Sequence, residues 1–222
     1  MFEFSTGDSQ KLHGLTLGYL VFDNVKVEKT NPELEATLTK TTDLVKKKFT
    51  TTDSLATDPL IKGVRQLFSS VGIDPTKERP SGEALIRRIL NGSIYRINAL
   101  VDCNNIISMT FGHPCGIYNA EKINGKIILD IGKEGEYYEG IGGRKLNAAN
   151  RIVTRDSLGI FGAPTADSAR TSVTIETKKA LLLIYHPPSV ATDQLEQAME
   201  MAKTTMPKIS GGQLIQSGVF SI

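Results

Sequence analysis

The spacing of the apolar residues changes once along this chain, and this change constrains the fold more than any other feature. In the first half, apolar residues recur every three to four positions, as on one face of a helix. From Lys126 onward they form short runs of strand length, separated by turns that contain glycine. Because helical and extended segments do not strictly alternate, we expect an α+β fold, with a helical N-terminal half packed on a mostly antiparallel or mixed sheet.

Residues that start or cap a helix mark where the expected helices begin. Asn31 and Asp58 each precede a proline, which fits the first turn, and a third helix opens at Ser81. A last helix is expected over residues 192–206, where apolar residues again have helical spacing. The expected strands are residues 15–22 paired with 25–27, then 127–131, 137–138, 151–154, 172–176 and 181–185.

Length and composition indicate a single globular domain over residues 1–222. Hydrophobic residues make up 40% of the chain and charged residues 23%, which is ordinary for a folded protein and excludes a disordered one. There is no internal repeat and no low-complexity linker. We expect a strand pair and helices in 1–72, a core in 73–190, and a helix and strand in 191–222.

Charge and hydropathy exclude several classes of protein. The chain has 26 basic and 24 acidic residues, unlike a protein that binds nucleic acid mainly by neutralising phosphates, so any such contact needs a local basic patch. No run approaches the roughly 20 apolar residues that cross a bilayer. The N-terminus also lacks the basic flank and apolar run of a secretory signal. We therefore expect a cytoplasmic protein that does not enter membranes.

A cluster of polar residues interrupts an otherwise apolar span in the middle of the chain. Residues 100–107 contain Asp102, Asn104 and Asn105 among core-forming residues, and His113 follows shortly after. Burying such groups is costly unless they face a partner or a ligand, so this span is a candidate binding site. The alternative roles are structural: Asp102 would cap a local helix, and His113 would be a hydrogen-bonded loop histidine.

Several other chemistries lack a complete set of residues. Cys103, Cys115 and His113 are one ligand short of a tetrahedral zinc site, and we expect no metal or other cofactor. His113 would favour a Cys115 thiolate only if the two side chains met, so small buried cysteines are the favoured interpretation. Neither glycine-rich segment, 140–143 or 159–162, has the pattern of a phosphate-binding loop.

Several dispersed motifs together resemble one known family. The segments are Arg79-Pro80-Ser81-x-Glu83-Ala84-Leu85-x-Arg87-Arg88, Ile97-Asn98-x-Leu100-Val101-Asp102-x-Asn104-Asn105, Gly112-x-Pro114, Ile123-x-Gly125-x-Ile127 and Gly159-Ile160-Phe161-Gly162. In this order they resemble the editing and tRNA-binding domain of the phenylalanyl-tRNA synthetase beta subunit. The match covers roughly residues 73–187, an ordinary domain size. The first segment is similar to that of freestanding relatives of the domain, which have no synthetase attached.

The resemblance implies an α+β module that, in the synthetase, hydrolyses tyrosine wrongly attached to the phenylalanine tRNA. The family's threonine falls on Asn104, its histidine on Gly116, its terminal acid on Asn119, and its glutamine on His113. The glutamate that reads the tyrosine hydroxyl has no acidic counterpart in residues 182–185. A pocket selects a phenol by pairing its hydroxyl, so tyrosine selectivity does not carry over to this chain.

The resemblance nevertheless implies a protein that binds tRNA and hydrolyses mischarged aminoacyl-tRNA in trans. An aminoacyl ester is activated, so a positioned water can do much of the work. The partner would be an aminoacylated tRNA 3′ end, and no DNA partner is expected. The competing class is a non-catalytic module that binds tRNA, an amino acid or a nucleoside.

Each candidate residue has an expected role under this interpretation. His113 would position or deprotonate water, and Asn105, with Asn104, would orient the aminoacyl adenosine. Backbone groups near Gly159 and Gly162 would receive the oxyanion, and Asp167 would hold the substrate amine. Ser168 has no nucleophile elbow around it and is expected only to help bind substrate. The residues expected to contact tRNA are Arg79, Arg87, Arg88 and Arg170.

Overall fold

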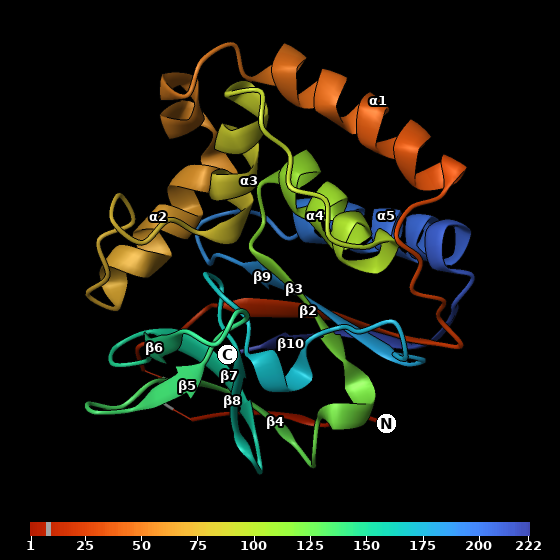
Figure 1. Cartoon of the computed structure of the whole chain (residues 1–222). Coiled ribbons are helices and arrows are strands. Elements are labelled where there is room, and N and C mark those ends of the chain that lie inside the picture. Colours follow the sequence, from red (N-terminus) through yellow and green to blue (C-terminus); the bar gives the residue numbers. More distant parts are fainter. Residues whose placement is uncertain (8–9) are drawn as a thin grey trace.

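The chain folds into three layers, with helices above a central sheet and a second sheet below it (Figure 1). The computed structural model describes residues 1–7 and 10–222. The helices are α1 (Pro32–Lys48), α2 (Pro59–Ser70), α3 (Ser81–Leu90), α4 (Ala99–Phe111) and α5 (Asp193–Ser210), with 3-10 turns η1 (Asp53–Thr57), η2 (Ala120–Lys122) and η3 (Ala169–Thr171). The expected α+β class is confirmed.

The central sheet combines strands from both ends and the middle of the chain. Its order is β10 (Gln213–Ser221), β2 (Thr16–Asp23), β9 (Ala180–His186) and β3 (Cys115–Asn119), and every pairing is antiparallel. Along β9, Leu182 and Ile184 pack under the helices, whereas Leu181, Leu183 and Tyr185 pack toward the lower sheet. A strand covered on both faces must be apolar at every position, which explains the unbroken apolar run that the sequence shows there.

The lower sheet is mixed. Its order is β1 (Phe4–Thr6), β4 (Ile127–Ile131), β7 (Ile152–Asp156) and β8 (Gly159–Gly162), with β1 and β4 parallel and the other pairs antiparallel. A small hairpin of β5 (Tyr137–Glu139) and β6 (Lys145–Asn147) lies beside it (Figure 1). The expected mostly antiparallel or mixed arrangement is therefore confirmed.

The predicted helix starts are confirmed where a local cap decides them. The Asn31 side chain accepts a hydrogen bond from the Leu34 backbone N–H, and that of Asp58 accepts from the Leu60 and Ile61 N–H groups. Each bond satisfies donors that a helix N-terminus leaves unpaired. The last helix extends beyond its predicted end to Ser210.

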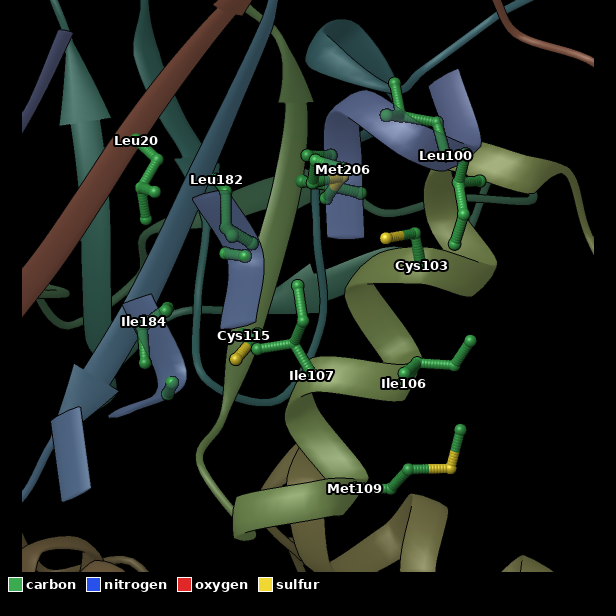
Figure 2. Packing of buried hydrophobic residues seen from close by; sticks show 14 of the residues in the cluster. Leu20, Leu100, Cys103, Ile106, Ile107, Met109, Cys115, Leu182, Ile184 and Met206 are labelled. Atoms are coloured by element: carbon green, nitrogen blue, oxygen red, sulfur yellow. The ribbon is translucent and has the colours of Figure 1, made fainter. Parts of the chain in front are cut away.

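The polar central span is a helix, α4, followed by a tight turn into β3. Asn98 caps it by accepting from the Val101 N–H, and Gly112 ends it with a φ of 98°, a left-handed conformation that favours glycine. Figure 2 shows Cys103 and Ile107 on the side of α4 that faces β3, with Cys115 across from Ile107. The side of α4 that packs on the sheet is thus apolar.

Two predicted strands are wrong. Residues 25–27 do not pair with the strand before them, because β2 pairs with β9 and β10 instead. Asn24 leaves β2 with a φ of 56°, and Val25 and Val27 then pack into the core beneath the helices. Residues 172–176 form no strand either, since Thr174 and Thr177 hydrogen-bond to each other across a turn.

Candidate functional site

A cavity of about 430 Å³ opens where the helical layer meets the loop that follows β8. Its walls come from α3, the segment before α4, α4 itself, the start of β3 and residues 165–173, with Ile141 of the β5–β6 hairpin at one side. A volume of this size is within the range of small-molecule sites. The polar residues of the lining include Arg79, Ser81, Arg88, Asn104, Asn105 and Asp167.

The wall formed by α4 and α3 contains polar atoms without partners. Asn104 is only 5% exposed, and its Nδ2 donates a long 3.4 Å hydrogen bond to Asn105 Oδ1. Asn104 Oδ1 and the Ser81 hydroxyl are buried and have no hydrogen-bond partner among the described residues. Unpaired buried polar groups are rare because each costs free energy. Two of them in one cavity wall make this wall a candidate for binding a polar ligand.

Asp167, from the loop after β8, adds an acidic group to the cavity lining. The Tyr118 hydroxyl donates a 2.7 Å hydrogen bond to Asp167 Oδ1. Burial raises the pKa of Asp167 to about 7, although the Tyr118 hydrogen bond opposes that change. The carboxyl group therefore exchanges a proton near neutral pH, as a general base requires.

Two glycines make room for the phenol that contacts this acid. A Cβ atom at either Gly116 or Gly162 would overlap the Tyr118 hydroxyl. The resemblance places the family's histidine at position 116, and here the Tyr118 phenol fills the space that such a side chain needs. Replacement of the histidine and presence of the Tyr118–Asp167 pair are therefore sterically linked. Gly162, expected to offer backbone groups to an oxyanion, is not in the cavity lining, and its missing side chain makes room for the Tyr118 hydroxyl.

The segment before α4 forms the mouth of the cavity. Tyr95 and Ile97 line it and are 69% and 60% exposed. The Arg88 guanidinium lies 5.1 Å from the centre of the Tyr95 ring. Arg79 is exposed at the same cavity, so both cations are available at its entrance.

Asp102 holds this segment in place and is not the helix cap. It accepts hydrogen bonds from the Ile97 N–H at 3.0 Å and from Arg96 Nε at 2.8 Å. The expected capping role belongs to Asn98 instead. Arg96 also binds Glu35 on α1, which ties the mouth to a second helix.

His113 does not share the cavity with the asparagines, contrary to the sequence-based expectation. It is 0% exposed, and its Nε2 lies 2.9 Å from His186 Nδ1. His186 Nε2 lies 3.0 Å from the Val190 carbonyl oxygen, which can only accept, so His186 donates there and accepts from His113. Burial lowers the pKa of His113 to about 3. A sealed neutral imidazole cannot act on water in the cavity, and its role is the structural alternative.

Two further predicted substrate residues lie away from the cavity wall. Gly159 is the first residue of β8, opposite Asp156 of β7, and its carbonyl accepts a hydrogen bond from Arg170. The Ser168 side chain caps η3 by accepting from the Arg170 N–H. In the structure both residues make local contacts, and neither lines the cavity.

The predicted arginines divide into paired and available ones. Arg87 Nε lies 2.7 Å from the buried Glu83 carboxylate, which Arg65 also binds. Arg170 binds the buried Asp156 carboxylate with two guanidinium nitrogens. Because these two neutralise buried acids, the cations left for a ligand are Arg79 and Arg88.

The cysteines are not placed for metal binding or nucleophilic attack. Cys103 and Cys115 are both buried and unpaired, as expected for small apolar residues. Burial raises the pKa of both thiols, which disfavours the reactive thiolate. Within residues 1–7 and 10–222, no three His, Cys, Asp or Glu side chains gather as a metal site requires.

None of the helices in the described residues combines the length and apolar composition that crossing a membrane needs.

Two candidate functional residues, Tyr95 and Tyr118, were not identified from the sequence. For Tyr95, the sequence signal was the segment 94–97, in which three of the four residues are large and apolar. For Tyr118 it was the glycine two positions earlier, on the same face of the strand.

Comparison with known proteins supports the resemblance that the motifs indicate. The chain is 34% identical over 85 residues to the phenylalanine–tRNA ligase beta subunit of Wolbachia sp. subsp. Brugia malayi, covering 38% of this chain and 11% of that subunit. With the Rickettsia conorii subunit, identity is 32% over 122 residues, or 55% of this chain and 13% of that one. The chain thus spans only a small part of the curated relatives it matches.

A solved structure and a family model complete these findings. An N-terminal fragment of the Pyrococcus horikoshii phenylalanyl-tRNA synthetase beta subunit superposes with a TM-score of 0.49 and 12% identity, covering 96% of this chain and 50% of that one. The model of the B3/4 domain family matches residues 63–209, which is more than half of the sequence. The chain belongs to the B3/4 domain family.

Proposed function

We propose that this protein binds the aminoacylated 3′ end of a tRNA in the 430 Å³ cavity and hydrolyses the ester of a mischarged tRNA in trans, in the cytoplasm. The observation that carries the proposal is the unpaired Asn104 Oδ1 in the lining of a cavity that also contains an acid, Asp167, and two exposed arginines, Arg79 and Arg88. An aminoacyl ester next to a phosphodiester needs this combination of hydrogen-bonding, acidic and cationic groups.

Each group has a part in the proposed reaction. Arg79 binds a phosphate at the cavity mouth, where Arg88 adds positive charge, and Asn104 and Asn105 hydrogen-bond to the aminoacyl adenosine. Asp167 accepts a proton from water as the water oxygen attacks the ester carbonyl. The bond to the ribose oxygen then breaks, and that oxygen takes the proton back from Asp167, which leaves a free amino acid, an intact tRNA and the carboxylate restored.

Asp167 replaces His113 as the group that we assign to water. Its pKa of about 7 keeps a substantial fraction of the carboxyl group deprotonated at neutral pH. Tyr118 fixes the orientation of the carboxyl group through one oxygen, which leaves the other for water. Such orientation of a base by a third group is common among hydrolases.

A second candidate is binding of the same tRNA end without turnover. Burial raises the pKa of the Cys115 thiol in the cavity wall, so this cysteine stays protonated and is a poor nucleophile. The lack of a cysteine nucleophile favours binding without turnover. Hydrolysis by this protein would depend on activated water alone.

The test follows loss of the aminoacyl group from a panel of mischarged tRNAs incubated with the purified protein. Hydrolysis faster than in buffer, reduced by Asn105→Ala, is the expected result. Asn124→Ala is the matched control, since Asn124 is exposed and outside the cavity. If tRNA binds and no ester is lost, the binding module is correct. Absence of both binding and ester loss contradicts both candidates.

A further inference from the structure

The segment between α3 and α4 exposes three large apolar side chains, those of Ile94, Tyr95 and Ile97. Tyr95 and Ile97 line the cavity, and so does Ile141 of the β5–β6 hairpin, which is exposed too. Single exposed apolar residues are ordinary, but a group of them around one opening usually marks an interaction surface. The question is which kind of partner covers it.

This segment is held rather than loose. The Ser93 N–H bonds to the Arg88 carbonyl, and the Asp102 carboxylate binds both the Ile97 N–H and Arg96. These bonds fix the backbone on both sides of Tyr95. A tyrosine presented from fixed backbone loses little conformational entropy when a partner covers it.

The neighbours of Tyr95 indicate the chemistry of the partner. Arg88 places its guanidinium over the ring at 5.1 Å, and no described residue forms an ion pair with Arg88 or Arg79. Unpaired nucleobases stack on aromatic rings and on guanidinium planes, whereas an apolar peptide gains nothing from two unneutralised cations. The charge and the planar surface together favour a single-stranded nucleic-acid end over a protein partner.

We propose that Tyr95 and Arg88 form a stacking platform for an unpaired nucleobase at the cavity mouth, with Arg79 binding an adjoining phosphate. The identity of the base as the terminal adenine of tRNA rests on the proposed function, but stacking itself does not. Tyr95 and Arg88 also border a smaller pocket of about 20 Å³ that Leu38 and Met109 help to line. The platform therefore lies between two hollows, with the larger one left for the acyl group.

The platform is tested by the affinity for uncharged tRNA with and without its unpaired CCA end. Tyr95→Ala should lower the affinity for intact tRNA about 10-fold or more, the usual loss for one base–aromatic stack, and leave binding of the truncated tRNA unchanged. Tyr95→Phe keeps the ring and should bind within about twofold of the parent protein. Its behaviour separates stacking from a hydrogen bond of the hydroxyl.

Tyr137 provides a matched control. It is 48% exposed and has the Lys145 ammonium 4.2 Å from its ring centre, yet it lies outside the cavity. Tyr137→Ala should therefore bind both tRNAs like the parent protein. If Tyr95→Ala binds intact tRNA as tightly as the parent, or Tyr137→Ala loses as much, the platform is wrong.

The proposed function can fail separately. If the CCA end increases affinity through Tyr95 but no mischarged tRNA loses its ester, the platform stands and hydrolysis is rejected. If the Tyr95→Ala variant hydrolyses mischarged tRNA at the parent rate when the tRNA concentration is limiting, hydrolysis stands and the platform is rejected. Selective binding of an acidic peptide, unaffected by competing CCA-ended tRNA, also overturns the platform.

Discussion

Two buried polar groups lie in the segment from α4 to β3, and only one of them borders the cavity. Asn104 and His113 are 5% and 0% exposed, and each has one buried atom without a hydrogen-bond partner among the described residues, Oδ1 and Nδ1. Asn104 borders a 430 Å³ cavity, whereas His113 packs against His186 with no such space. Burial of a polar group therefore marks a site only where open space adjoins it.

The largest expected effect that tests this contrast comes from removing Asp167, the acid in the cavity lining. Asp167→Asn should lower the rate of ester hydrolysis about 100-fold or more, because removal of a general base commonly costs this much. In the parent protein the rate should rise with pH up to about 7 and then level, following the pKa of Asp167. Asp43→Asn, on the exposed side of α1, is the control.

The same substitution should leave the fold intact and change its pH dependence. The folded-state pKa of Asp167 is raised, so the carboxyl group stabilises the fold below pH 3.8 and that contribution is lost as pH rises through about 7. Asp167→Asn removes this loss. Denaturant unfolding at pH 5 and pH 8 should show a smaller decrease in stability for the variant. An equal decrease in both proteins would contradict the assignment of Asp167 as a buried acid.

For the buried His113 we expect a substitution to lower stability and to leave activity unchanged. His113→Leu leaves His186 Nδ1 without its donor and should lower the free energy of unfolding by about 1–3 kcal/mol. Ester hydrolysis per folded molecule should not change, because the imidazole does not reach the cavity. His13→Leu, at an exposed histidine, should alter neither quantity. A specific loss of hydrolysis in His113→Leu would erase the contrast between the two buried groups.

The buried histidine pair should also make the folded state less stable at acidic pH. Because burial depresses the pKa of His113 from 6.5 to about 3, its contribution to stability is present above pH 6.5 and is lost as pH falls toward 3. A fully shifted group contributes roughly 1.4 kcal/mol per pH unit in that window. His186 has a lowered pKa too, although the nearby Asp193 opposes the change. The slope should be smaller in His113→Leu.

A smaller effect is expected at Gly162, which makes room for the Tyr118 hydroxyl that hydrogen-bonds to Asp167. Gly162→Ala overlaps the Tyr118 hydroxyl and should cost about 1–3 kcal/mol of stability, as overpacking usually does. Displacing the phenol should also slow hydrolysis, because Asp167 loses its hydrogen bond. Adding Tyr118→Phe should recover part of the stability and none of the rate. Full recovery of both would show that the hydrogen bond has no part in positioning the acid.

Local features were readable from the sequence, and non-local ones were not. Asn31 and Asp58 locate helix starts because a cap and its N–H partners lie within three residues. Residues 25–27 were misassigned because strand partners are chosen across the chain, and β2 finds better ones in β9 and β10. The polar span was identified as a candidate site, but polarity alone did not separate Asn104, which borders the cavity, from His113, which does not.

The site residues show the same limit. Gly162 was selected for an exposed backbone, yet its importance comes from the Tyr118 ring, which reaches it from another strand. Glu83 lies four residues before Arg87 on one helix, so this pair was foreseeable, whereas Asp156 beside Arg170 depends on the lower sheet. Free and engaged arginines look identical until the acids around them are placed.

The smallest expected effect concerns these arginines. Arg79→Gln removes a cation from the mouth and should weaken tRNA binding a few-fold, lowering the dependence of log affinity on log salt concentration by about 1. Arg87→Gln removes the same charge from a residue engaged by Glu83, so the salt slope should stay unchanged while unfolding becomes easier. Equal salt slopes in both variants would mean that only net charge matters. Because ion pairing already neutralises Arg87, we expect the slopes to differ, and that difference separates cations that bind ligand from cations that stabilise the fold.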